Sequence, residues 1–158
     1  MKAGMRTLAV AVALGGAAGA AASQAAGEKR RPLVEHYTSP ATTSLKLPFS
    51  EAVRVGNLLF LSGQLGLAPG TRTLAPGGVV PETRQTLENI RRIAEAHGSS
   101  MDRLVKCTVF LADMAEWPRM NEVYVTFFPR ALPARSAMGA SGLALGARVE
   151  IECIGAVD

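Results

Sequence analysis

The segment from Leu104 to Leu111 is almost entirely apolar, and it lies between two segments with helical periodicity. A strand of this composition is normally buried on both faces, which predicts a central place in a sheet. The preceding segment, 81–96, begins with Pro81, which suits a first helical position, and Gly98 suits the C-terminal cap. Residues 116–128 form the second helical segment. The chain is therefore predicted to contain a sheet with two helices packed on it.

Four further segments have the composition of strands. Residues 50–55 and 58–62 flank a Gly-Asn pair and predict a hairpin. Residues 136–140 and 148–157 follow the second helix and are joined by a Gly-rich turn. The predicted order is β-β-α-β-α-β-β, which indicates an α+β fold with a mixed sheet and both helices on one face.

The second face of this sheet is predicted to remain uncovered within one chain. It carries polar side chains at Lys106, Thr108, Arg148, Glu150 and Glu152. An exposed and partly apolar sheet face is commonly buried against another copy of the same protein. We therefore expect an oligomer.

The first 26 residues have the pattern of a secretory signal peptide. Lys2 and Arg6 form a short positive region, residues 8–22 are an uninterrupted run of Ala, Val, Leu and Gly, and small residues then offer cleavage sites. The apolar run is weak for a spanning helix, which needs about 20 clearly apolar residues. An uncleaved anchor is the alternative. The pattern predicts signal cleavage near residues 1–26 and an exported, periplasmic protein with no membrane contact afterwards.

The mature chain is predicted to be one domain with a mobile N-terminal tail. Residues 27–47 mix charge, Pro, Ser and Thr without a period, which is typical of a tail, and residues 48–158 form the domain. The net charge of +4 includes Lys2 and Arg6 of the signal segment. No cluster of Lys and Arg interleaved with aromatic residues is present, so nucleic acid is not expected as a partner.

Cys107 and Cys153 both fall on the apolar phase of predicted strands. Two cysteines in an exported protein are compatible with a disulfide, but buried free thiols are the favoured interpretation. A metal site needs more ligands than two thiols, and His36 and His97 lie in unrelated contexts. We expect no metal.

Candidate chemistry lies in two places near the C-terminus. Arg135, in the sequence Pro-Ala-Arg-Ser, precedes a predicted strand, and Glu150 lies in the last strand. Arginine can bind a carboxylate through two parallel hydrogen bonds, and a glutamate facing it could hold and polarise a water. Glu152 is the alternative base. An ordinary surface ion pair between the arginine and the acid is the simpler interpretation.

Several segments together resemble the Rid family of reactive-intermediate deaminases, also called the YjgF family. The matching segments, in order and with matching gaps, are 55–57, 61–64, 82–90, 105–111, 120–124, 133–136 and 149–152. The resemblance implies a chorismate-mutase-like α+β fold and a homotrimer with an active site in each cleft between subunits. It also implies hydrolysis of 2-imino and 2-enamino acids to 2-keto acids and ammonia, without a metal or an organic cofactor.

The resemblance also implies roles for individual residues. Arg135 matches the arginine that binds the substrate carboxylate, and Glu150 matches the glutamate that positions the attacking water. The implied substrate-binding positions are Phe49, Ser62, Gly63, Asn121, Arg135 and Ala137. Two of these depart from the family pattern, because Phe49 replaces a tyrosine and Ala137 replaces a cysteine.

Two other functions are compatible with the same residues. A non-catalytic trimer could retain Arg135 to bind small carboxylate ligands, because a fold does not fix a function. An RNA-cleaving activity is the second alternative, and both the predicted export and the absence of a basic, aromatic groove argue against it.

Overall fold

The computed structural model describes residues 31–44 and 46–158. Pro32–Asp158 forms one compact unit, which is the folded domain. The predicted signal peptide, with its cleavage and export, lies outside the described residues. Within the described part of the chain, no helix is long and apolar enough to cross a membrane.

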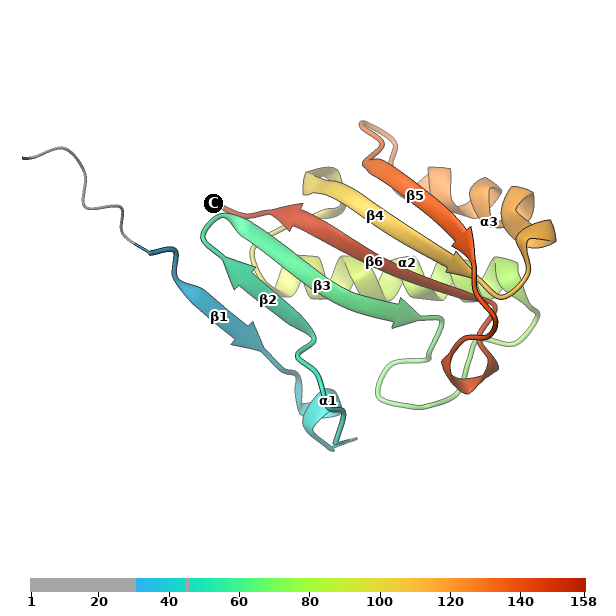
Figure 1. Ribbon diagram of the computed structural model, residues 1–158, viewed down its shortest axis with the longest axis horizontal. Helices are drawn as coiled ribbons and strands as arrows, with labels where there is room; N and C mark the ends of the chain where they lie inside the picture. Colours follow the sequence, from blue (N-terminus) through green and yellow to red (C-terminus); the bar gives the residue numbers. More distant parts are fainter. Residues whose placement is uncertain (1–30, 45) are drawn as a thin grey trace, which may run out of the picture. The chain divides into compact units, whose positions relative to one another are not determined.

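The domain is built on a six-stranded sheet with the order β1-β2-β3-β6-β4-β5. The strands are β1 (Val34–Tyr37), β2 (Ala52–Val55), β3 (Leu58–Leu65), β4 (Leu104–Leu111), β5 (Ala134–Gly139) and β6 (Val149–Ala156). Neighbouring strands are antiparallel except β4 and β5, which are parallel. Figure 1 shows β6, the last strand of the chain, inserted between β3 and β4. The prediction of a mixed sheet is confirmed.

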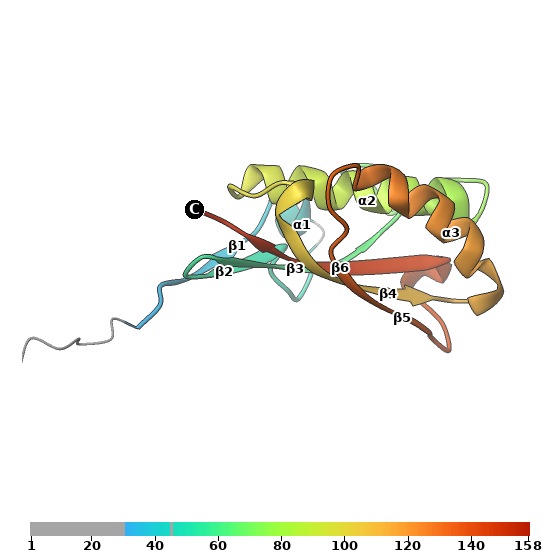
Figure 2. The same ribbon diagram turned by 90° about the horizontal axis from the view of Figure 1, so that it is seen from above.

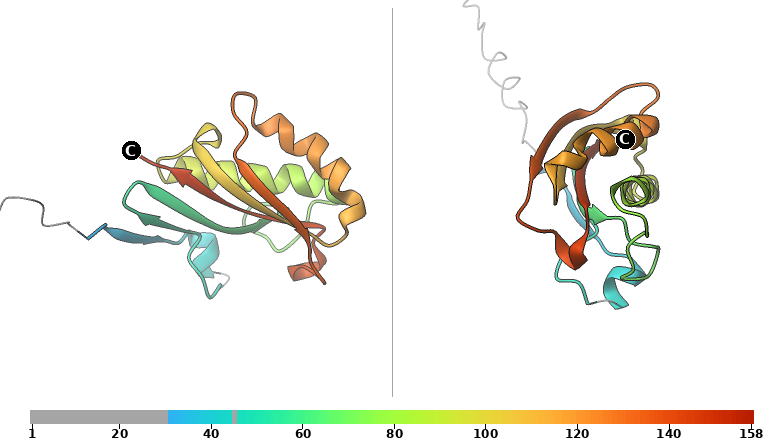
Figure 3. Two further views of the ribbon diagram at one scale, coloured as in Figure 1. Left: turned by 45° about the horizontal axis from the view of Figure 1, so that its top comes forward. Right: turned by 90° about the vertical axis from the view of Figure 1, so that its right-hand side faces the viewer.

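Two main helices, α2 (Val79–Ala96) and α3 (Trp117–Tyr124), lie on one face of the sheet, as Figures 2 and 3 show. The short helices are α1 (Pro40–Ser44), η1 (Met101–Arg103), η2 (Met114–Glu116), η3 (Val125–Phe127) and η4 (Ala144–Gly146). The core lies between the two main helices and the sheet. Its largest fully buried side chains include Leu59, Leu87, Ile90, Ile93, Val109, Leu111, Met120 and Ile151. The predicted α+β architecture with helices on one face is therefore confirmed.

The predicted elements differ from the observed ones mainly at their ends. Helix α2 begins at Val79, two residues before Pro81, which is tolerated because amide groups of a first helical turn have no partner within the helix. Its end is as predicted, since Gly98 follows with a positive φ of 80°. The second predicted helix, 116–128, is divided into α3 and the 3₁₀ turn η3.

The prediction of a mobile tail over residues 27–47 was wrong for part of that range. Val34–Tyr37 forms β1, which pairs with the whole of β2. The ring of Tyr37 also stacks on His97, the C-cap residue of α2, with 4.1 Å between ring centroids. A four-residue strand has too short a pattern to be recognised locally, and its stability comes from these contacts with distant segments.

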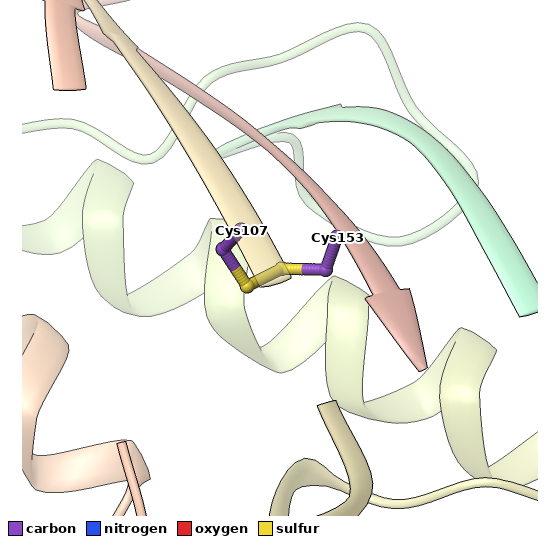
Figure 4. The surroundings of a disulfide bond; sticks show 2 residues. All are labelled: Cys107 and Cys153. Atoms are coloured by element: carbon purple, nitrogen blue, oxygen red, sulfur yellow. A yellow bond between two sulfur atoms is a disulfide. The ribbon is translucent and has the colours of Figure 1, made fainter. Parts of the chain in front are cut away.

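The favoured interpretation of Cys107 and Cys153 as free thiols was also wrong. The two residues face each other in the register of β4 and β6 and form a buried disulfide with an S–S distance of 2.03 Å (Figure 4). Both had been placed correctly on the apolar phase of their strands. What the sequence did not reveal is that β6 lies directly beside β4, because strand neighbours are a long-range property of the fold.

Candidate active site

Glu150 lies on the uncovered face of the sheet, directly beside Gly63 of the neighbouring strand. A β-bulge between Leu61 and Gln64 shifts the register of β3 against β6 at this point. A Cβ atom added at Gly63 would overlap Oε1 of Glu150 and approach its Cδ to 2.9 Å. A side chain at this position would therefore have to displace the Glu150 carboxylate.

The surroundings of Glu150 favour its protonated form. Burial raises the pKa of this carboxyl group, and the negative charge of Glu152, two residues along the same face, raises it further. No cation among the described residues pairs with Glu150. Glu152, the alternative base, is exposed. Glu150 is thus the better placed of the two acids to act as a general base.

Ser62 has a structural role at this site. Its hydroxyl donates a hydrogen bond of 2.7 Å to the carbonyl of Ser50, and its amide donates to the carbonyl of Glu51. These two hydrogen bonds hold Ser50 and Glu51, which precede β2, against Ser62 of β3. As a result Phe49, which is 49% exposed, and Gly63 line the same pocket of about 370 Å³. The structure therefore brings Phe49, Ser62, Gly63 and Glu150 into one group.

Arg135 belongs to a second group of residues. In the parallel register of β4 and β5 it is the partner of Cys107, so its side chain lies on the helix-covered face. The guanidinium carbon is 4.6 Å from the centroid of the Tyr124 ring. None of the described carboxylates lies within ion-pair distance of Arg135, so the simpler interpretation of a surface ion pair is not supported. Its guanidinium remains available for an anionic ligand.

Two unsatisfied polar atoms lie on α3, the helix that carries Tyr124. The hydroxyl of Tyr124 and Oδ1 of Asn121 are both buried and have no hydrogen-bond partner within the described structure. The two residues are one turn apart on α3, so they share a face. Burial raises the pKa of Tyr124 to about 12, against an opposing effect of Arg135, so the phenol is neutral. Buried polar groups without partners cost roughly 1–3 kcal/mol each, and such groups are expected where a ligand binds.

Ala137 is the remaining predicted site residue. It lies two residues after Arg135 on the same face of β5 and packs against the hydrophobic core. At this position the site therefore has only a methyl side chain and the backbone N–H and C=O groups. The second group consists of Asn121, Tyr124, Arg135 and Ala137.

The two groups are separated by the sheet itself. Glu150 lies on the uncovered face, whereas Arg135 lies on the face covered by α3. The two side chains cannot meet within one chain. The arrangement offers two half-sites, one with a carboxylate and a pocket, the other with a guanidinium that pairs with none of the described carboxylates.

Sequence reasoning missed two residues of these half-sites. Tyr124 was not named among the candidate residues, although its spacing from Asn121 could have suggested a shared role. Leu145, which lines the pocket beside Gly63, lay in a turn without any pattern. Among residues 31–44 and 46–158, no group of three His, Cys, Asp or Glu side chains could hold a metal ion.

Comparison with known proteins identifies the family. The sequence model of the family described as Endoribonuclease L-PSP matches residues 40–157. A Mus musculus protein named 2-iminobutanoate/2-iminopropanoate deaminase is 47% identical over 124 residues, which cover 78% of this chain and 90% of that protein.

Solved structures agree with this match. A conserved Rid family protein from Yersinia pestis has a TM-score of 0.73 and 32% identity, covering 79% of this chain and 100% of its own. The structure of E. coli TdcF with bound serine has a TM-score of 0.66 and 32% identity, covering 70% and 89%. The predicted resemblance is thereby confirmed: this chain belongs to the Rid (YjgF-like) family, whose sequence model carries the description Endoribonuclease L-PSP.

Proposed function

We propose that the protein is a deaminase that hydrolyses 2-imino and 2-enamino acids to 2-keto acids and ammonia at sites shared by two subunits of a homotrimer. One subunit contributes Arg135 and its neighbours, and the next contributes Glu150 and Gly63. The observation that carries the proposal is the pair of complementary half-sites on opposite faces of one sheet. The deaminase name of the mouse relative and the serine bound to TdcF support this substrate class.

Arg135 would bind the substrate carboxylate. Its guanidinium has no acidic partner among the described residues, and the Tyr124 ring holds it from one side. A bidentate pair with the carboxylate fixes the orientation of the adjacent imine carbon. Oδ1 of Asn121 and the Tyr124 hydroxyl can satisfy their unused hydrogen-bonding capacity on the ligand or on an accompanying water.

Glu150 would handle the water and the protons. The oxygen of a water adds to the imine carbon while Glu150 accepts one of its protons, and that proton passes to the nitrogen. The new hydroxyl then passes its proton through Glu150 to the nitrogen, the carbon–nitrogen bond breaks, ammonia leaves and the carbon becomes a ketone. The raised pKa of Glu150 brings the base closer to neutral pH, where proton transfer in both directions is efficient.

The uncovered face of the sheet supports the proposed assembly. Leu58, Phe60 and Met138 are between 38% and 46% exposed on this face. Several large apolar side chains exposed on one face are typical of an interface. Burying this face against another subunit would also allow Glu150 to approach a neighbouring Arg135.

The disulfide supports the proposed export. A buried bond between Cys107 and Cys153 would form and persist in an oxidising compartment such as the periplasm. Mass spectrometry of the exported protein would locate the cleavage site, and an intact Met1 in a soluble fraction would contradict signal cleavage.

Mixed trimers provide the sharpest test of a shared site. Arg135→Ala and Glu150→Gln should each abolish acceleration of imine decay, measured on imines generated by an amino-acid oxidase. Unfolding and remixing the two inactive variants in equal amounts should restore activity. Random assembly places an intact Arg135 beside an intact Glu150 in about one quarter of the sites.

The possible outcomes separate the alternatives. Wild-type activity without recovery on mixing would place both residues in one subunit and contradict the shared site. Wild-type protein that binds 2-keto acids but does not accelerate imine decay would indicate a binding protein. Each variant refolded alone is the control for recovery caused by refolding itself.

A further inference from the structure

We infer that the pocket beside Gly63 receives the side chain of the substrate and selects 2-imino acids whose side chains are large and apolar. This inference rests on the proposed function, because it concerns the same site. The pocket has a volume of about 370 Å³, within the range of small-molecule sites. Its apolar lining comes from Leu47, Phe49, Leu65, Leu67, Ala144 and Leu145. A short side chain of one or two carbons would leave most of this space unfilled.

The pocket lies beside the reacting position, and the two share Gly63. Gly63 forms part of its wall, and the carboxylate of Glu150 lies against Gly63. Leu65, another lining residue, is the register partner of Glu150. A substrate whose imine carbon faces a water on Glu150 can therefore extend its side chain past Gly63 into the pocket. Apolar surface buried there contributes about 25 cal/mol per Å² to binding.

Leu145 is the residue best placed to decide the selectivity. It is 56% exposed, lies outside the hydrophobic core and lines the pocket from the turn before β6. Its φ is 58°, in the left-handed region that a leucine rarely adopts. An apolar side chain held in this unfavourable backbone conformation at a pocket is the kind of feature found at functional sites. With Phe49, it gives the pocket two exposed apolar groups from separate loops.

The charges of the pocket do not favour a cationic side chain. Glu51 is 8% exposed, and its oxygens are 3.8 Å from Nε2 of His97 and 3.9 Å from a guanidinium nitrogen of Arg92. Arg72 lines the same pocket. A positively charged substrate group would meet this arginine and would compete for a glutamate that already has two basic neighbours.

Binding of 2-keto acids, the reaction products, tests the subsite without turnover. Isothermal titration calorimetry should show 4-methyl-2-oxopentanoate binding about tenfold more tightly than pyruvate. Leu145→Asn should remove most of this preference, because asparagine tolerates the left-handed conformation but has no apolar side chain to offer the pocket. Leu33→Asn is the matched control at another exposed leucine, 69% accessible and outside this pocket, and should preserve the preference.

Turnover measurements distinguish an error in the subsite proposal from an error in the deaminase proposal. If imines from leucine and alanine are processed with equal kcat/KM, and Leu145→Asn changes both equally, the subsite is overturned and the deaminase stands. A binding preference lost in Leu145→Asn, without acceleration of any imine, would support the subsite and overturn the deaminase. Tighter binding of 5-guanidino-2-oxopentanoate, or no binding of any keto acid, would overturn the apolar subsite.

Discussion

The carboxylate of Glu150 lies against the α-carbon of Gly63, in the space that any other residue would fill with its Cβ. The bulge in β3 places this glycine beside the acid, and the uncovered face of the sheet leaves room for a ligand above it. Gly63 therefore has two consequences for the proposed site. It sets the position of the base, and it opens the wall of the neighbouring pocket.

Gly63→Ala should lower kcat by about 100-fold, because a methyl group would displace the Glu150 carboxylate, and an error of about 1 Å in a catalytic group has an effect of this size. Steady-state kinetics of imine hydrolysis measures the loss. Gly139→Ala is a suitable control, since its Cβ would meet only the flexible side chain of Met114, with Cγ at 3.1 Å. Equal activity of Gly63→Ala and wild type would contradict the role of the carboxylate's position.

The pH dependence of the reaction should report Glu150. Because the base acts when deprotonated and its pKa is raised, activity should fall with decreasing pH at a higher pH than an ordinary glutamate would give. Glu152→Gln removes one cause of the raised pKa, so the acid limb of kcat/KM should move to lower pH. An acid limb that is unchanged in Glu152→Gln would argue against Glu150 as the group observed.

Glu150→Gln should increase stability at neutral pH while abolishing activity. A carboxyl group whose pKa is higher in the folded protein than in the unfolded chain binds protons more strongly when folded, so it destabilises the fold once the pH exceeds its unfolded pKa. The stability difference between variant and wild type should therefore grow as the pH rises from below 4 to neutrality. Urea titrations across this range measure it, and a constant difference would contradict the expected linkage.

Tyr124 should act on substrate binding through its ring. Tyr124→Leu removes the aromatic surface beneath the guanidinium of Arg135 and should raise KM about fivefold with little change in kcat. Tyr124→Phe keeps the ring and is the matched variant, so its KM should remain closer to wild type than the KM of Tyr124→Leu. An equal rise in KM for both variants would instead assign the effect to the hydroxyl.

The local elements of this fold could be predicted because their patterns are short-range. Alternation and helical periodicity placed β2, β3, β4, β6 and α2 to within a few residues. The pairing of β1 with β2 and the disulfide between β4 and β6 depend on contacts between distant segments, and both were missed. Tertiary context decides such features, so no local pattern reveals them.

The candidate site likewise combines residues whose position follows from a local pattern with residues whose position depends on distant contacts. Glu150 could be assigned to the uncovered face because Val149, Ile151 and Cys153 alternate with it. The strand around Arg135 offers no such alternation, since residues 134–139 are mostly small, so its face could not be read. The separation of the two half-sites by the sheet therefore emerged only from the fold. Motif resemblance nevertheless predicted residues in both half-sites.

The disulfide should make the stability of the domain depend on redox conditions. The bond joins residues separated by 46 positions, and a cross-link of this kind typically contributes about 2–4 kcal/mol, mainly by restricting the unfolded chain. Urea unfolding with and without dithiothreitol should show a loss of this size. A Cys107→Ala/Cys153→Ala double variant should be insensitive to the reductant, which separates the bond from other effects of dithiothreitol. If wild-type protein unfolds at the same urea concentration under both conditions, either the bond is absent in solution or it does not stabilise the fold.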